Sequence, residues 1–123
     1  MNTNNGNETI SWELALQQVN GKNKLAVDMM KMLIDSFPAH ESELSTAYKA
    51  KDYEALHHAV HKLYGALCYT GTPRLKKIAK ELEISFQAKS PKHHIDKLYQ
   101  QLHVEMKEVK KAYAQMDFKH FHP

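Results

Sequence analysis

Glycine and proline punctuate this chain sparingly, and the segments between them have a helical pattern. The 123 residues include four glycines and four prolines, and the stretches between these breakers carry apolar residues three and four positions apart. That spacing is the period of an amphipathic helix, whereas strand-like alternation is nearly absent. Short connections between such helices make neighbouring helices antiparallel. The sequence therefore predicts an all-α fold: an antiparallel up-down four-helix bundle with an additional short N-terminal helix.

Capping residues and helix breakers place the expected helices. These helices cover about residues 11–19, 23–51, 53–70, 73–89 and 91–116. Pro38 lies within the second helix, and we expect it to kink or interrupt that helix because proline removes a backbone hydrogen bond. Asp52 is a good N-cap for the third helix, and Gly71 is expected to end that helix. Thr72-Pro73 and Ser90-Pro91 each place a cap before a first-turn proline.

The apolar positions of these helices predict the core. The expected core residues are Trp12, Leu16, Val19, Leu25, Met29, Met30, Leu33, Phe37, Leu44, Ala47, Tyr48, Leu56, Val60, Leu63, Leu67, Leu75, Ile78, Leu82, Phe86, Ile95, Leu98, Leu102, Met106, Val109 and Tyr113. Met32, like its neighbours Met29 and Met30, is expected to fill the core rather than a binding groove.

Composition and charge narrow the class of protein. The 17 Lys and Arg residues interleave with 14 Asp and Glu residues, which indicates a solvated surface and no nucleic-acid-binding stripe. Cys68 is the only cysteine, so a reducing compartment is expected. No apolar run approaches the ~20 residues that span a bilayer. We expect a cytoplasmic, monomeric bundle over residues 10–117 without direct membrane contact. A disordered lead-in or linker (1–9) and a short tail (118–123) are expected to flank it.

The third expected helix contains a glycine on the same face as a histidine. Gly65 follows His61 by four residues, so the two lie on one face of the helix. A glycine within a helix costs about 1 kcal/mol relative to alanine, so a second role is needed to explain it. The missing side chain exposes the surface beside the imidazole, with His57 and Tyr64 as the adjoining residues. We interpret His61 as a residue that another molecule approaches.

Counting across the next turn identifies a neighbour for this histidine. If the turn is centred near Gly71-Thr72, His61 faces Leu82 or Glu83. Leu82 belongs to the expected core, which leaves Glu83 beside the imidazole. A carboxylate that accepts a hydrogen bond from one ring nitrogen fixes the tautomer and leaves the other nitrogen free as a nucleophile.

These residues resemble those of a known family. The run His61-Lys-Leu-Tyr-Gly65-Ala, a glycine ten positions after the histidine and Leu82-Glu83 further on are similar to the histidine phosphotransfer (HPt) domain. The resemblance covers about residues 25–115 and is close to the C-terminal domain of BarA-type hybrid sensor kinases. One position departs from the family pattern, because Tyr64 stands where the family usually has Lys or Arg. Lys62 and Lys80 are the candidates to supply a cation instead, unless none is present.

The resemblance implies a function and partners. His61 would accept a phosphoryl group from a receiver-domain aspartate of the parent hybrid kinase and pass it to the aspartate of a cognate response regulator. Gly65 would give the receiver access, and Glu83 would hydrogen-bond the histidine ring. The domain would be a phosphocarrier without kinase activity and without a cofactor, because the receiver supplies Mg²⁺. The parent protein would be anchored in the bacterial inner membrane.

Two other interpretations remain open at the level of sequence. The chain has nine histidines, and His57 with His61 forms an i, i+4 pair that could chelate Zn²⁺ or Ni²⁺. Di-metal bundles, however, use inward carboxylates with Glu-x-x-His motifs, and none lies on an expected core stripe, so we expect no metal. The second alternative is a helical interaction module without chemistry, in which basic residues such as Lys80 form only a solvated face.

Overall fold

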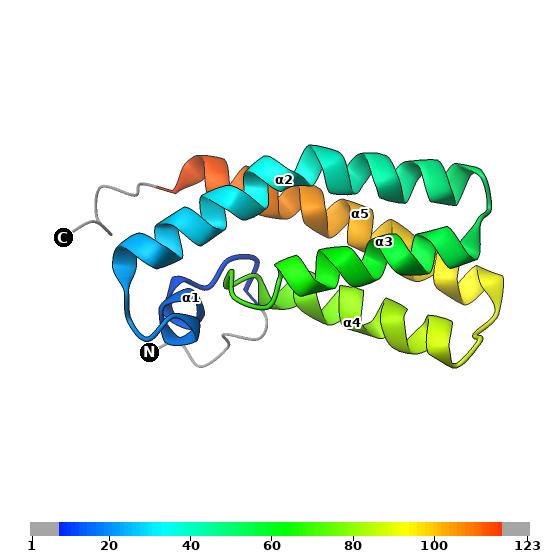
Figure 1. The fold of residues 1–123 in the computed structure, drawn as a ribbon, viewed down its shortest axis with the longest axis horizontal. Coiled ribbons are helices and arrows are strands. Elements are labelled where there is room, and N and C mark those ends of the chain that lie inside the picture. The colour runs from blue at the N-terminus through cyan, green and yellow to red at the C-terminus, as the bar shows by residue number, and fades with distance from the viewer. Residues whose placement is uncertain (1–7, 117–123) are drawn as a thin grey trace.

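The computed structural model describes residues 8–116, which form five α-helices and contain no strand (Figure 1). The helices are α1 (Trp12–Gln18), α2 (Asn23–Lys49), α3 (Tyr53–Ala66), α4 (Pro73–Gln87) and α5 (Lys92–Gln115). The predicted all-α class and the number of helices are confirmed. The predictions of a lead-in and a tail concern residues that, apart from 8 and 9, lie outside the described part of the chain.

The four long helices form the bundle and α1 lies at one end of it. Consecutive helices pack against each other from α2 to α5, and α5 also contacts α2. Figure 1 shows α1 beside the start of α2 and the turn that joins α3 to α4. Of the expected caps, Asp52 accepts a hydrogen bond from the Ala55 backbone N–H at 3.0 Å. The Ser90 prediction is wrong, because Pro91 occupies the cap position of α5 and α5 begins at Lys92.

Helix α2 passes through Pro38 without interruption. Pro38 is exposed, so the carbonyl group that loses its intrahelical donor can meet water. The stronger form of the prediction, an interruption, is therefore wrong. The hydroxyl of Ser36 also donates to the Leu33 carbonyl oxygen at 2.6 Å in the turn before the proline.

The predicted core positions are buried or half-buried, except for two on α2. The main cluster joins all four long helices, and a second, smaller cluster consists of Ala15, Val19, Ala26 and Met30 under α1. Leu25 and Met32 are exposed, which contradicts the expected core positions. Met32 is 68% exposed because it lies two residues, about 200° of rotation, from the fully buried Met30.

Helix α3 ends earlier than predicted, and Gly71 has another role. The helix ends at Ala66, and Gly71 (φ +67°) lies in the turn before α4. The Gly71 carbonyl accepts from the Ser11 N–H at 2.8 Å, and the Gly71 N–H donates to Gln18 Oε1 at 3.0 Å. A Cβ added at Gly71 would lie 2.6 Å from the Ser11 carbonyl oxygen and 2.7 Å from Ala15 Cβ. Gly71 therefore allows α1 to dock closely on the α3–α4 turn.

Candidate functional site

The α3–α4 hairpin places a buried carboxylate against an exposed imidazole. His61 Nδ1 lies 2.7 Å from Glu83 Oε1. The histidine side chain is 69% exposed, whereas that of the glutamate is only 9% exposed. The expectation that Glu83 flanks His61 is therefore confirmed. The buried partner fixes the ring, and the solvent side of the ring remains open.

The hydrogen bond defines which ring nitrogen is available. An ionised carboxylate can only accept hydrogen bonds, so Nδ1 of His61 carries the proton that binds Glu83. In the neutral imidazole the proton on Nδ1 leaves a lone pair on Nε2. Nε2 is therefore the nitrogen that can act as a nucleophile toward a group arriving from solvent.

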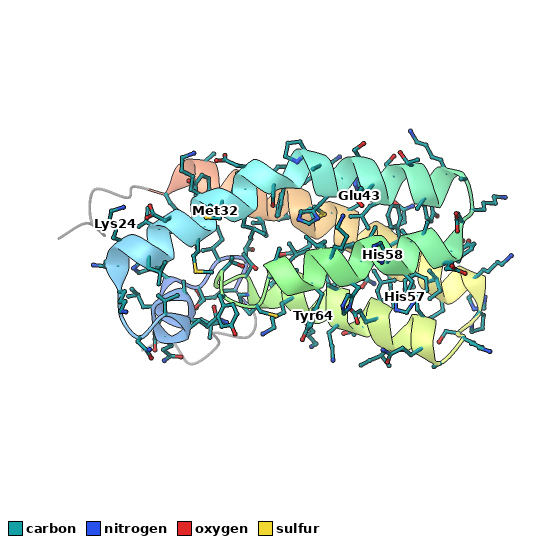
Figure 2. All side chains as sticks on the ribbon, in the orientation of Figure 1. Lys24, Met32, Glu43, His57, His58 and Tyr64 are labelled. Carbon is teal, nitrogen blue, oxygen red and sulfur yellow. The ribbon has the colours of Figure 1, made fainter. Side chains whose placement is uncertain are left out.

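Helices α3 and α4 also contact each other one turn before and one turn after the His61–Glu83 pair. The ring of His57 stacks on Phe86 with ring centroids 4.8 Å apart. In the opposite direction, Lys80 Nζ lies 5.3 Å from the centre of the Tyr64 ring. Moving one turn along α3 thus corresponds to moving one turn back along α4, as an antiparallel helix pair requires. Figure 2 shows His57 and Tyr64 on the side of α3 that faces α4.

Gly65 opens the surface beside His61. A Cβ added at this position would have no neighbouring atom within 4 Å. The glycine borders a groove of about 320 Å³ between α2 and α3, whose other lining residues include Met29, Met32, His40 and Tyr69. No packing contact therefore requires a glycine here. The open space at Gly65, one turn along α3 from His61, is consistent with the predicted access.

Lys62, the other lysine that the sequence offers as a cation near His61, points toward α2. Its ammonium group donates to both carboxylate oxygens of Glu43, at 3.0 and 3.1 Å. The hydrogen bond from Lys62 lowers the pKa of the Glu43 carboxyl group below its usual value. Glu43 was not among the predicted site residues. Counting around Asp52, the turn between α2 and α3, would have placed it opposite Lys62.

A metal site is not supported in the described part of the chain. No group of three or more His, Cys, Asp or Glu side chains within residues 8–116 is arranged to hold a metal ion. The two histidines of the proposed chelating pair are separately engaged, since His57 stacks on Phe86 and His61 binds Glu83. Two of the nine histidines, His120 and His122, lie outside the described residues. No helix between residues 8 and 116 is long and apolar enough to cross a membrane.

A helical bundle that presents an exposed histidine, fixed by a carboxylate on the next helix, is the arrangement expected of a phosphotransfer domain. The Hpt domain family matches residues 28–116, and the chain belongs to this family. It is therefore a phosphotransfer domain of two-component signalling.

Individual relatives agree with this assignment. The chain is 38% identical over 79 residues to the signal transduction histidine-protein kinase BarA of Escherichia coli K12, and 33% identical over 79 residues to the sensor protein GacS of Pseudomonas syringae. Each alignment covers 64% of this chain but only 9% of the relative. The crystal structure of an HPT domain from a Shewanella sensor hybrid histidine kinase superposes with a TM-score of 0.81 at 34% identity. That match covers 87% of this chain and 92% of the other.

Proposed function

We propose that His61 is the residue that carries the phosphoryl group. It takes the group from the aspartyl phosphate of one receiver domain and passes it to the aspartate of a response regulator. The observation that carries this proposal is the 2.7 Å contact between His61 Nδ1 and the buried carboxylate of Glu83, on a side chain that is 69% exposed.

The chemistry follows from the tautomer. The Nε2 lone pair of His61 attacks phosphorus, the N–P bond forms, and the P–O bond to the donor aspartate breaks. The aspartate leaves as a carboxylate with the electron pair of that bond. The ring keeps its proton on Nδ1 and becomes positively charged, and the Glu83 carboxylate stabilises that charge. Transfer to the second receiver reverses these steps, so no proton has to leave the site.

The same proposal covers the wider system. The domain acts as a phosphocarrier without kinase activity of its own, and Mg²⁺ belongs to the receiver domains that it meets. Gly65 provides the clearance for the receiver surface. By the similarity to BarA and GacS, we infer a parent sensor kinase in the bacterial inner membrane, with this domain in the cytoplasm as a monomer.

The proposal is tested by transfer from a phosphorylated receiver to the wild-type chain and to two histidine variants. His61→Gln is expected to take no label. His58→Gln is the matched control, because His58 is an exposed histidine on the same helix that borders a groove against α2, and it is expected to be labelled like the wild type. Labelling of the His61→Gln variant, or no labelling of the wild type, would refute the proposal.

A further inference from the structure

A phosphoryl group on His61 would create an electrostatic problem. It would add about two negative charges to the imidazole ring, and the Glu83 carboxylate already binds the same ring. Like charges at that separation repel, and a nearby cation would offset the repulsion. Sequence leaves two lysines, Lys62 and Lys80, as candidates for this cation, and the structure separates them.

Lys62 is already neutralised. Its ammonium group is bound by both oxygens of Glu43, so its charge is balanced by a carboxylate on α2. Lys62 also follows His61 directly, which places it about 100° around α3, on the side away from the α4-facing imidazole. Moving Lys62 to the phosphoryl group would break the ion pair with Glu43.

Lys80 has a different kind of partner. Its ammonium group lies over the ring of Tyr64, 5.3 Å from the ring centre. An aromatic face attracts a cation without cancelling its charge, and the N–H donors of the ammonium group remain able to bind an anion. Within residues 8–116, Lys80 forms no ion pair with a carboxylate.

The helix register places Lys80 one turn from the His61–Glu83 pair. Lys80 precedes Glu83 by three residues on α4, and Tyr64 follows His61 by three residues on α3. Residues three apart on a helix are surface neighbours. The cation over Tyr64 and the imidazole over Glu83 are therefore successive contacts of one interface, and the long stem of Lys80 gives its ammonium group reach toward Nε2.

We propose that Lys80 is the cation that stabilises the phosphoryl group on His61, and that Tyr64 is the positioning residue that holds the ammonium group in place without neutralising it. This inference rests on the proposed role of His61. It assigns to α4 both groups that act on the phosphorylated ring, a carboxylate at Nδ1 and an ammonium group for the phosphoryl oxygens.

The test uses phosphoramidate, a small donor that needs no receiver. In this reaction the N–P bond of the donor breaks, a bond from Nε2 to phosphorus forms, and ammonia leaves. Lys80→Met keeps the length of the side chain without its charge, and is expected to slow labelling about tenfold, the effect of losing one charge-assisted hydrogen bond. Lys80→Arg should recover most of the rate. Lys77→Met, an exposed lysine on the same helix, is the matched control and should behave like the wild type.

A second measurement separates charge from structure. A nearby ammonium group favours the doubly ionised phosphoryl group, so Lys80→Met should raise the pKa of the phosphoryl group on His61, measured by ³¹P NMR. Tyr64→Leu should produce a smaller shift in the same direction. Equal slowing by Lys80→Met and Lys80→Arg, or an unchanged pKa in Lys80→Met, would overturn the inference, as would a slow Lys62→Met beside a normal Lys80→Met. Labelling of His61→Gln would instead refute the proposed function.

Discussion

The charge of Glu83, and not only its hydrogen bond, should control how readily His61 accepts a phosphoryl group. Glu83→Gln changes a single atom on a side chain that is buried on α4, and the carboxamide oxygen can still accept the Nδ1 proton of His61. The variant therefore keeps the ring orientation and the tautomer, and loses only the negative charge. What it removes is the attraction that grows as the ring becomes positively charged.

The size of the effect follows from the geometry. A neutral hydrogen bond contributes about 1 kcal/mol and one to a charged group about 2 kcal/mol, so the difference is about 1 kcal/mol. The imidazole is 69% exposed, and water screens its charge, so the difference should be about 0.5 to 1 kcal/mol. Since each 1.36 kcal/mol is a factor of ten, we expect transfer to be about two- to fivefold slower.

The assay is single-turnover transfer from a phosphorylated receiver, with the free energy of unfolding measured by urea titration for each variant. Glu81→Gln, an exposed glutamate two residues earlier on α4, is the matched control and should transfer at the wild-type rate. Glu83→Ala, which also frees the ring, should be slower than Glu83→Gln. A Glu83→Gln variant that is folded and transfers at the wild-type rate would refute the reasoning, because the carboxylate charge would then have no part in the reaction.

Two further predictions concern glycines. Gly65→Ala should raise the free energy of unfolding by up to about 1 kcal/mol, because the added Cβ has no neighbour within 4 Å. Gly65→Gln should slow transfer from a receiver. Unchanged transfer by that variant would show that access is not the role of this glycine. Gly71→Ala should destabilise the domain by more than Gly21→Ala in urea titration. Both residues have positive φ, a strain of about 1–2 kcal/mol for alanine, but only Gly71 has backbone 2.6 Å from the added Cβ. Equal losses would show that α1 is not tightly docked.

The parts of the fold that local rules determine were predictable. Apolar periodicity and caps placed the helices to within a few residues, because each helix buries one face against its neighbours in the chain. The contact of His61 with Glu83 followed from counting around one turn. The same count predicts Tyr64 opposite Lys80. In an antiparallel hairpin, facing residues are equally far from the turn, and Tyr64 is three residues nearer to it than His61, as Lys80 is three residues nearer than Glu83. A count around Asp52 would likewise have revealed the Glu43 partner of Lys62.

The errors arose where contacts distant in sequence decide the local structure. The sequence predicts that Gly71 ends α3, but its backbone is fixed by Ser11 and Gln18, more than fifty residues earlier, and α3 ends at Ala66. Nothing near Gly71 in the sequence indicates that α1 covers it. The error at Met32 has a local cause instead. Its apolar side chain predicts a core position, but the helical period assigns Met30 to the buried face and Met32 to the groove beside Gly65.

A phosphoryl carrier must hold its cargo without trapping it, and the proposed site meets both conditions. Interactions that are equally strong before and after transfer do not change the barrier, whereas strong stabilisation of the phosphorylated form would raise the barrier to the second transfer. The Glu83 carboxylate is present in both forms and gains strength only as the ring becomes charged. The ring itself lies mostly in water, which screens that gain. An ammonium group held by an aromatic ring, rather than by a carboxylate, can move to the phosphoryl oxygens and return to Tyr64 without breaking an ion pair. In the proposed site, the α3–α4 hairpin therefore combines a nucleophile, a carboxylate partner and a movable cation on adjacent turns, which suits reversible transfer.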